Sequence, residues 1–309
     1  MKISVVIPNF NGRSLLKKNL PKILKYSGVH ELIVVDDAST DESIEELRTQ
    51  NLKLRTNKIK VIKNRKNLGF SSTVNRGVTE AAHELVVLLN TDVYPEKNYL
   101  DFALEHFKDP QVFAVGFLQK SIEGSDIVLR GRGVGKFERG FLAHRRGDVN
   151  RPNTLWVSGG ASVFRKNIWE KLGGMSTIYS PFYWEDIDLS YRALKAGYRL
   201  IFEPKSVVYH EGQEGAIRSF YTSSQIKTIA YRNQIFFVWS NITDWSLVFQ
   251  HLLFIPYHIL RSFITGDLAF IHGFILAFKK LPYILRKRQQ YSKLFLLTDK
   301  DILLYRVGP

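Results

Sequence analysis

Carboxylate side chains follow apolar runs at several places in the chain, where they suit chemistry on a charged ligand. Asp36 and Asp37 end one such run, Asp92 follows another, and Glu185 and Asp186 open a segment with helical periodicity. Carboxylates can hold a hard divalent cation such as Mg²⁺ or Mn²⁺, and they can remove a proton from a hydroxyl group. We therefore ask which elements bring these residues together.

Up to about residue 120 the sequence alternates short β-branched runs with helical stretches, which is typical of a parallel α/β sheet. The predicted strands are Ile3 to Ile7, Leu32 to Asp36, Ile59 to Ile62 and Leu85 to Leu89. The predicted helices are Ser14 to Tyr26, Asp41 to Thr49 and Ser72 to Ala82, the second of them with a capping box from Ser39 and Glu42. Because ligands bind beyond the carboxyl ends of parallel strands, we expect the loops after the first two strands to share one crevice, which a base and a ribose would fill.

The rest of the first predicted domain, residues 1 to 215, is less regular. Residues 121 to 155 are rich in Gly and Arg and predict an irregular hairpin or loop over the sheet edge. The elements expected after them are a strand from Trp156 to Phe164, helices from Asn167 to Leu172 and from Glu185 to Ala196, and a strand from Arg199 to Phe202. His210 and Gly212 close this domain.

Each carboxylate also has a structural interpretation. The pair Asp36 and Asp37 suits a turn and helix cap, and Asp92 suits the cap of a following helix. Asp188 and Arg192 have the spacing of an ordinary helical ion pair. An imidazole that follows a strand, as His210 does, can complete a metal site or be purely structural.

Residues 216 to 309 predict a helical, membrane-associated extension. The run Trp245 to Leu260 has no charged side chain, but Gln250, His251, Pro256 and later polar residues interrupt it, so we expect interfacial helices rather than a membrane span. Basic and aromatic residues intermingle near its end and suit an anionic membrane surface, although a solvated helix face would look the same. This cluster comprises Lys279, Lys280, Arg286, Lys287 and Arg288, beside Phe278, Leu281, Tyr283 and Ile284.

Charge, cysteine content and missing motifs exclude several kinds of partner and protein class. The formal charge of +15 predicts an anionic partner, but no nucleic-acid-binding motif accompanies it, and we expect no nucleic acid partner. The chain has no Cys, so a metal must bind oxygen or imidazole ligands. The dinucleotide motif G-x-G-x-x-G does not follow the first strand, and no P-loop motif is present. The N-terminus has no signal-peptide pattern, so we expect the protein at the cytoplasmic face of the membrane.

The ordered motifs together resemble those of family 2 glycosyltransferases with the GT-A fold, especially the rhamnosyltransferase-like branch. The resemblance runs from Ile3 to about Gly212. Its motifs are VVIPNFN, VVDDASTD, NLGFSSTVNRG, LLNTD, GGASVFRKNIWEKLGG, WEDIDLSYR and the His of YHEG.

The resemblance implies an α/β, GT-A nucleotide-diphospho-sugar transferase fold and an inverting enzyme that uses a UDP- or dTDP-linked sugar with Mg²⁺ or Mn²⁺. Matching positions imply nucleoside contacts for Pro8, Asn11, Asp36 and Asp37, and a pocket shaped by Asn67 and Gly69. Asn90 and Asp92 match the D-x-D metal motif, and His210 matches the metal-site histidine. Asp186 matches the catalytic base, with Glu185 beside it.

Two departures from the family pattern concern the metal and the acceptor. Asn90 replaces the first Asp of D-x-D, which leaves the metal one carboxylate fewer, and Gly173-Gly174-Met175-Ser176 replaces the usual Gly-Gly-Phe-Asp-Glu. The Q-x-x-R-W motif of processive synthases is absent, so we expect single sugar additions to a glycan or lipid-linked glycan, as in cell-envelope polysaccharide synthesis. The alternative is a noncatalytic sugar-nucleotide or membrane-binding module with the same fold.

Overall fold

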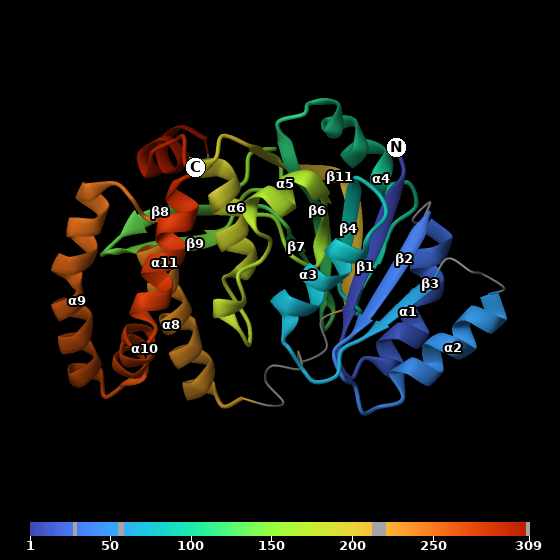
Figure 1. The fold of residues 1–309 in the computed structure, drawn as a ribbon, viewed down its shortest axis with the longest axis horizontal. Helices are drawn as coiled ribbons and strands as arrows, with labels where there is room; N and C mark the ends of the chain where they lie inside the picture. Colours follow the sequence, from blue (N-terminus) through green and yellow to red (C-terminus); the bar gives the residue numbers. More distant parts are fainter. Residues whose placement is uncertain (27–29, 55–58, 212–220, 307–309) are drawn as a thin grey trace.

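The computed structural model describes residues 1–26, 30–54, 59–211 and 221–306. Within these residues, nine strands form one mixed sheet with helices on both faces, and further helices pack at one end of it (Figure 1). The strand order is β3-β2-β1-β4-β10-β6-β11-β5, with β7 paired to β6.

The first half of the sheet is parallel, as the sequence predicts. It comprises β1 (Ile3–Asn9), β2 (Glu31–Asp36), β3 (Ile59–Lys63) and β4 (Leu85–Leu89), with the helices α1 (Arg13–Tyr26), α2 (Ser43–Leu54) and α3 (Phe70–Glu80) between them. Successive strand side chains point to opposite faces, so Val5 packs in the core that also holds Leu16 of α1, and Val6 packs in the core that holds Val74 of α3. Because the four strands pair in parallel, their carboxyl ends lie at the same edge of the sheet.

The second half of the sheet mixes strand directions. Antiparallel β10 (Ala161–Arg165) joins β4 to β6 (Val112–Glu123), and β11 (Arg199–Glu211) runs parallel to β6. The short β5 (Val93–Pro95) closes the edge against the end of β11. The helical elements that accompany these strands are α4 (Tyr99–Glu105), the 3-10 turn His106–Lys108, α5 (Lys166–Leu172) and the 3-10 turn Thr177–Tyr179.

Residues 121–155 are more regular than we predicted. β7 (Asp126–Arg130) pairs with the end of β6, and β8 (Gly133–Glu138) pairs with β9 (Phe141–Arg146) as a separate two-stranded sheet. The expected irregular hairpin or loop is therefore two regular hairpins. Their many Gly and Arg residues conceal the alternation that normally reveals a strand, because both ribbons are largely solvent-exposed.

Helix α6 (Glu185–Lys195) joins the sheet to the C-terminal helices. These are α8 (Ser223–Asn241), α9 (Trp245–Thr265), α10 (Ala269–Phe278) and α11 (Leu281–Ser292), followed by a π-helical turn over Asp301–Arg306. One hydrophobic core contains Leu189 of α6, Phe237 of α8 and Ile284 of α11. The predicted helical extension is confirmed, whereas the boundary near residue 215 lies outside the described residues and stays a prediction.

Buried charges bind α6 to its neighbours. Asp188 accepts hydrogen bonds from Arg192 Nε of the same helix at 2.8 Å and from Asn241 Nδ2 of α8 at 2.7 Å. One turn further, Lys195 Nζ lies 2.8 Å from Asp299 Oδ1, and both of these side chains are fully buried. The helical ion pair expected from the spacing of Asp188 and Arg192 forms, and it is buried where α6 meets α8.

The predicted capping box at the start of α2 was wrong. The helix begins at Ser43, two residues after the predicted start at Asp41, and Glu42 has a positive φ of 60°, so the box of Ser39 and Glu42 does not form. Ser39 instead accepts a hydrogen bond from the Asn11 amide, and Asp41 caps the first turn through Ser43.

Helix α9 contains the apolar run that begins at Trp245. By length and composition alone it is apolar enough to cross a membrane, and only 11% of its most apolar window is buried. The polar residues that interrupt the run lie within one continuous helix, which passes through Pro256 and carries one fixed charge, on Arg261. Whether this helix lies at an interface stays a prediction.

Candidate active site

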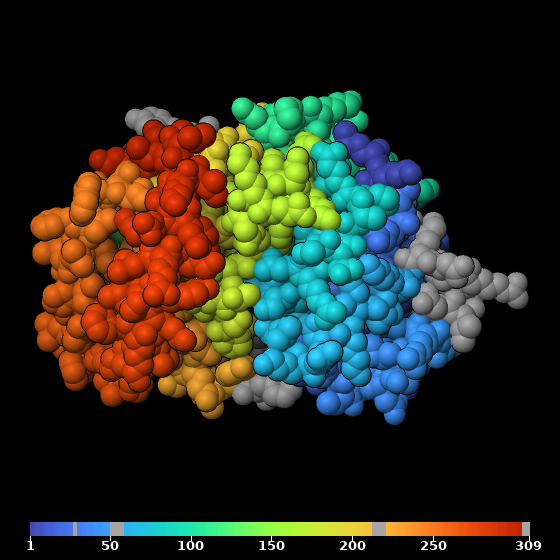
Figure 2. Space-filling model, in the orientation of Figure 1, coloured from blue at the N-terminus to red at the C-terminus, as the bar shows by residue number. Residues whose placement is uncertain are grey.

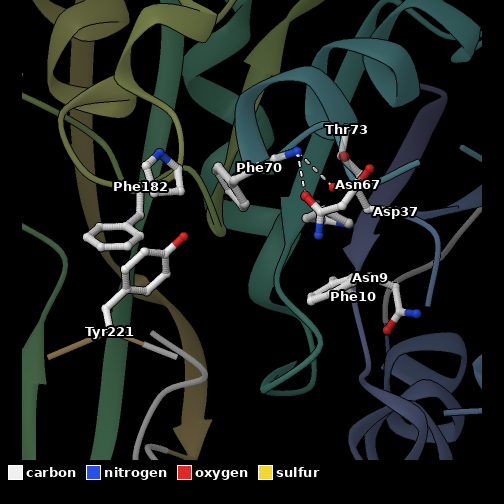
Figure 3. A pocket seen from close by; sticks show the side chains of 11 residues that line it. Asn9, Phe10, Asp37, Asn67, Phe70, Thr73, Phe182 and Tyr221 are labelled. Atoms are coloured by element: carbon white, nitrogen blue, oxygen red, sulfur yellow. Dashed lines mark hydrogen bonds between the residues drawn. The ribbon is translucent and has the colours of Figure 1, made fainter. Parts of the chain in front are cut away.

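A cavity of about 570 Å³ opens at the carboxyl ends of β1 and β2. Its walls include Pro8, Asp37, Asn67 and Gly69, four of the residues predicted to surround a nucleoside. Figure 3 shows the aromatic rings of Phe182 and Tyr221 on one side and Asp37 and Asn67 on the other. The remaining lining residues are Asn9, Phe10, Phe70, Thr73 and Pro181. The cavity therefore combines apolar rings with a few polar groups, as small-molecule sites commonly do.

The Asp37 carboxylate organises one wall of this cavity. It accepts a hydrogen bond from the amide of Gly69 at 2.9 Å (Figure 3). It also accepts hydrogen bonds from the amide of Leu68 at 2.9 Å and from Asn64 Nδ2 at 2.7 Å. Gly69 has a φ of +81°, a conformation that glycine adopts without the strain of a side chain. Asp37 thus holds the NLGF loop in the shape that lines the pocket.

Asn11 and Asp36 lie behind this wall. Asp36 is fully buried and accepts a hydrogen bond from Asn9 Nδ2 at 2.8 Å. Asn11 Oδ1 accepts one from the Thr40 amide at 2.8 Å, which joins the loops after β1 and β2. Neither residue is among those lining the cavity, so their direct contacts with a nucleoside stay predictions.

The predicted metal-site residues meet at the junction of β5 and β11. Antiparallel pairing places His210 opposite Val93, and His210 Nε2 lies 3.1 Å from Asp92 Oδ2. This hydrogen bond is the main cause that raises the pKa of His210, while burial opposes it. Asn90 starts the same turn, where its carbonyl accepts the Val93 amide.

This junction offers some, but not all, of the ligands that a divalent cation needs. Asp92 Oδ1 and Asn90 Oδ1 are buried and have no hydrogen-bond partner among the described residues, so each has a lone pair available. Carboxylate and amide oxygens suit Mg²⁺ and Mn²⁺. The described part of the chain has no group of three or more His, Asp or Glu residues that could hold an ion unaided. A bound cation would therefore need ligands from its substrate as well.

Glu185 and Asp186 begin α6, where the helix dipole favours negative charge. Burial raises the pKa of both carboxyls, and for Glu185, which also lies beside the Asp186 charge, it rises to about 8. Glu185 Oε2 is buried without a hydrogen-bond partner in the described structure. Asp186 instead accepts the Ile187 amide at 2.8 Å and faces an open cavity.

This second cavity, of about 500 Å³, brings Asp186 and His210 to one space. It lies beside the first cavity, with Gly159 between the two. The Gly159 amide points to Asp186 Oδ2 at 3.5 Å, and a Cβ atom at Gly159 would lie 3.3 Å from the Phe70 ring of the first cavity. A ligand that extends from the first cavity past Gly159 would therefore reach the Asp186 carboxylate.

Helix α8 holds the loop that precedes α6. Asn233 Nδ2 lies 2.9 Å from the carbonyl oxygens of Tyr179 and Phe182 and 3.0 Å from that of Tyr183, and Arg232 donates to the Ser180 carbonyl at 2.6 Å. This loop ends in Tyr183 and Trp184, whose φ angles of 71° and 81° are unusual for large side chains. Contacts from α8 therefore fix a strained segment directly before Glu185.

Sequence reasoning missed the aromatic side of the first cavity. Phe10 and Phe70 belong to the motifs VVIPNFN and NLGF, so their positions beside polar residues gave a usable signal. Phe182 and Tyr221 come from distant segments, and their approach, with ring centroids 5.0 Å apart, depends on the packing of α8. No local pattern reveals such a meeting.

Comparison with known proteins decides the family. The model of "Glycosyltransferase like family 2" matches residues 1–228 of the chain. The chain belongs to this family. The predicted family and the prediction of a glycosyltransferase are thereby confirmed at the family level, and the match ends within α8.

Curated relatives are similar over the same part of the chain. The pre-mycofactocin glycosyltransferase of Mycobacterium tuberculosis is 29% identical over 68% of this chain, and poly-beta-1,6-N-acetyl-D-glucosamine synthase of Staphylococcus aureus is 24% identical over 67%. The chain spans 42% and 49% of the lengths of these two relatives. These proteins therefore identify the family rather than the substrates of this chain.

Solved structures confirm the GT-A fold. GalNAc-T7 with UDP, GalNAc and Mn²⁺ has a TM-score of 0.71 at 17% identity, covering 99% of this chain and 56% of its own. Staphylococcus aureus TarS 1-349 with UDP-GlcNAc has a TM-score of 0.61 at 16% identity, covering 95% and 90%. The mannosyltransferase PcManGT of Pyrobaculum calidifontis, with GDP-Man and Mn²⁺, has a TM-score of 0.56 at 17% identity, covering 94% and 74%.

The buried Glu185 predicts a pH-dependent stability. The folded state holds the Glu185 proton up to about pH 8, whereas the unfolded chain releases it near pH 4.5, so this group's contribution to stability is lost as pH rises between those values. Glu185→Gln mimics the protonated form. Its melting temperature should exceed that of the wild type by a margin that grows from pH 5 to pH 8 in calorimetry. The exposed Glu45→Gln is the control, and a margin independent of pH would contradict the assignment.

Proposed function

We propose that the protein is an inverting, nonprocessive glycosyltransferase that moves one sugar from a nucleoside diphosphate sugar to a hydroxyl group of a glycan or lipid-linked glycan. The observation that carries this proposal is the contact across Gly159, which places the aromatic cavity beside the Asp186 carboxylate. A nucleoside in the first cavity would direct its sugar toward Asp186. We propose a UDP- or dTDP-linked donor, supported by the uridine nucleotides of GalNAc-T7 and TarS.

Asp186 is the proposed catalytic base. It lines the second cavity, and burial raises its pKa, so its carboxylate is a better proton acceptor than an ordinary Asp. As the acceptor oxygen attacks C1, its proton passes to Asp186, the new C1–O bond forms, and the bond from C1 to the diphosphate breaks. Attack from the face opposite the leaving group inverts the configuration at C1.

Asp92 and His210, with Asn90, are the proposed residues for a divalent cation, Mg²⁺ or Mn²⁺. Support comes from the unpartnered oxygens of Asp92 and Asn90 and from the Mn²⁺ of two structural neighbours. When bound, such a cation neutralises negative charge that develops on a departing diphosphate. In the described chain Asp92 orients the His210 ring, which faces the same cavity as Asp186.

Asp186→Asn should separate catalysis from donor binding. Loss of a positioned general base costs about 10²- to 10⁴-fold in rate, so kcat should fall by that factor. The variant should still be stabilised by the nucleotide sugar that stabilises the wild type in a thermal-shift panel of UDP-, dTDP- and GDP-sugars. Asn is nearly isosteric and keeps an acceptor oxygen for the Ile187 amide, so the fold should persist.

The matched control is Asp101→Asn, an exposed carboxylate on α4 that lines neither cavity. Full transfer activity in Asp186→Asn would show that the base is assigned wrongly. Nucleotide-sugar binding without any transfer by the wild type would favour a noncatalytic module with the same fold.

We further propose that α9 lies on a membrane, at the cytoplasmic face. Its exposed apolar side chains recur with helical spacing along one side. They are Trp245, Phe249, Leu252, Leu253, Leu260, Phe263 and Ile264. The opposite side faces the protein, where His251 and His258 contact the carbonyl oxygens of Gly140 and Arg139 at 2.7 and 2.9 Å. The two histidines of this helix thus face the protein, and its large apolar side chains face outward.

Basic residues adjoin this apolar helix at the same end of the molecule. The C-terminal helices form one end of the space-filling view (Figure 2), and Lys279, Lys280 and Arg286 are exposed there beside Phe278 and Leu285. An apolar stripe with nearby cations suits a membrane surface that contains anionic lipids. Such binding would bring the second cavity near a lipid-linked acceptor.

Leu253→Glu should weaken membrane binding. Leu253 is 62% exposed, so the charge should leave the fold intact but oppose insertion of the stripe. We expect reduced co-sedimentation with vesicles of phosphatidylcholine and phosphatidylglycerol. Phe102→Glu adds the same charge at a residue of α4 that is 43% exposed, and it should bind like the wild type. Equal loss in both variants, or no binding by the wild type, would overturn the proposal.

A further inference from the structure

Four arginines border the cavity that contains Asp186. Arg130, Arg132, Arg145 and Arg146 line it together with Asp186 and His210. A smaller adjoining cavity, of about 280 Å³, is lined by Arg132, Arg145, Arg146 and Arg151 together with Val134, Gly147 and Asp148. The two cavities therefore share three arginines, which form a path leading from Asp186 toward the β8–β9 hairpin.

The Arg132 side chain is buried and held in place by hydrogen bonds. Its side chain is 3% exposed, and Nε and Nη2 donate to the carbonyl and Oδ1 of Asn153 at 2.6 and 2.8 Å. These partners are neutral, so they orient the guanidinium without cancelling its charge. Burial and the nearby Arg151 lower the pKa of Arg132 and outweigh the opposing effect of Asp148, so the folded chain compensates this cation incompletely.

The hairpin brings the other arginines beside Arg132. Pairing of β8 with β9 places Arg146 opposite Gly133 and Arg145 opposite Val134. Gly147 donates its amide to the Arg132 carbonyl at 2.9 Å, and a Cβ atom there would crowd the Arg132 guanidinium. A glycine at this position thus permits a close approach of the hairpin end to Arg132.

Acidic residues neutralise little of this cluster. Glu123 pairs with Arg130, but Arg132, Arg145, Arg146 and Arg151 make no ion pair within 4.0 Å to any residue of the described ranges. Unpaired guanidinium groups in a concave site suit carboxylate or phosphate, whose oxygens accept paired hydrogen bonds from the planar fork. The positive charge of these arginines therefore suits the binding of an anion.

We propose that the acceptor carries an anionic group, a phosphate or carboxylate, which Arg132, Arg145 and Arg146 hold while the acceptor hydroxyl lies at Asp186. This proposal rests on the proposed transferase function. The arginines serve the acceptor rather than the donor because the smaller cavity excludes Asp186, His210 and every residue of the aromatic cavity. Its arginines thus extend beyond the reaction centre, away from the donor.

The test measures anion binding by NMR titration of the full chain. Glucose 6-phosphate and glucuronate are the soluble probes, and glucose is the neutral reference. We expect both anions to bind better than glucose, and Arg145→Gln/Arg146→Gln to weaken them about ten- to a hundredfold, the range for hydrogen bonds to charged groups. Lys17→Gln/Arg48→Gln removes two exposed charges from α1 and α2 and should bind as the wild type does.

A second arm distinguishes a lipid-linked anion from a free one. Vesicles of phosphatidylcholine with and without a polyprenyl phosphate measure the increment in binding that the phosphate gives, and the arginine variant should lose that increment. If the arginine variant loses binding only to the soluble anions, the acceptor is a soluble anionic glycan. If it loses only the binding increment on vesicles, the acceptor is lipid-linked. Equal binding by both double variants in both arms overturns the proposal.

Binding of the nucleotide sugar shows whether a negative result contradicts the acceptor proposal or the proposed transferase function. The arginine variant should keep the thermal shift that nucleotide sugars produce in the wild type. If the wild type binds nucleotide sugars but the anions bind independently of the arginines, the acceptor proposal alone fails. If the wild type binds no nucleotide sugar, the proposed function fails first.

Discussion

The buried charge of Asp188 is the constraint on which the active-site geometry depends. Its carboxylate has no solvent exposure and receives Arg192, Tyr179 and Asn241, which come from α6, the loop before it and α8. Removing one partner of a buried ion pair costs about 3–5 kcal/mol, because the other charge stays buried without compensation. These three segments must therefore keep their relative positions if the charge is to remain satisfied. Asp186, two residues away on the same helix, takes its position from this arrangement.

The C-terminal helices consequently belong to the catalytic unit as well as to the proposed membrane contact. Asn233 and Arg232 hold the loop before α6, and Asp299 receives Lys195 from its last turn. The outer helix α9 packs against the β8–β9 hairpin through His251, and the same hairpin carries Arg145 and Arg146 of the second cavity. Only the β8–β9 hairpin would thus separate a membrane contact at α9 from the proposed acceptor site.

The sequence predicted those parts of the protein that local patterns determine. The parallel strands β1 to β4 and helices α1, α3, α5 and α6 have strong periodicity, and their positions agree with prediction to within a few residues. Ordered motifs also located Asp37, Asn67 and Asp186 in the cavity walls. The Asp188 junction, the Tyr221 wall and the role of Asn233 were missed because each joins segments that lie more than 35 residues apart or face each other only after folding. The sequence predicted an irregular hairpin or loop over residues 121–155, but not the individual strands, because exposed ribbons lack an apolar alternation.

Hydrogen–deuterium exchange of the wild type and Asp188→Asn tests most directly whether one buried charge holds these segments together. We expect the variant to lose protection in α6, in the loop over residues 177–184 and in the C-terminal half of α8 together, while β1 to β3 keep theirs. Asp126→Asn, an exposed carboxylate on β7, should leave every segment unchanged. Loss of protection confined to α6, with α8 and the loop unaffected, would contradict the account.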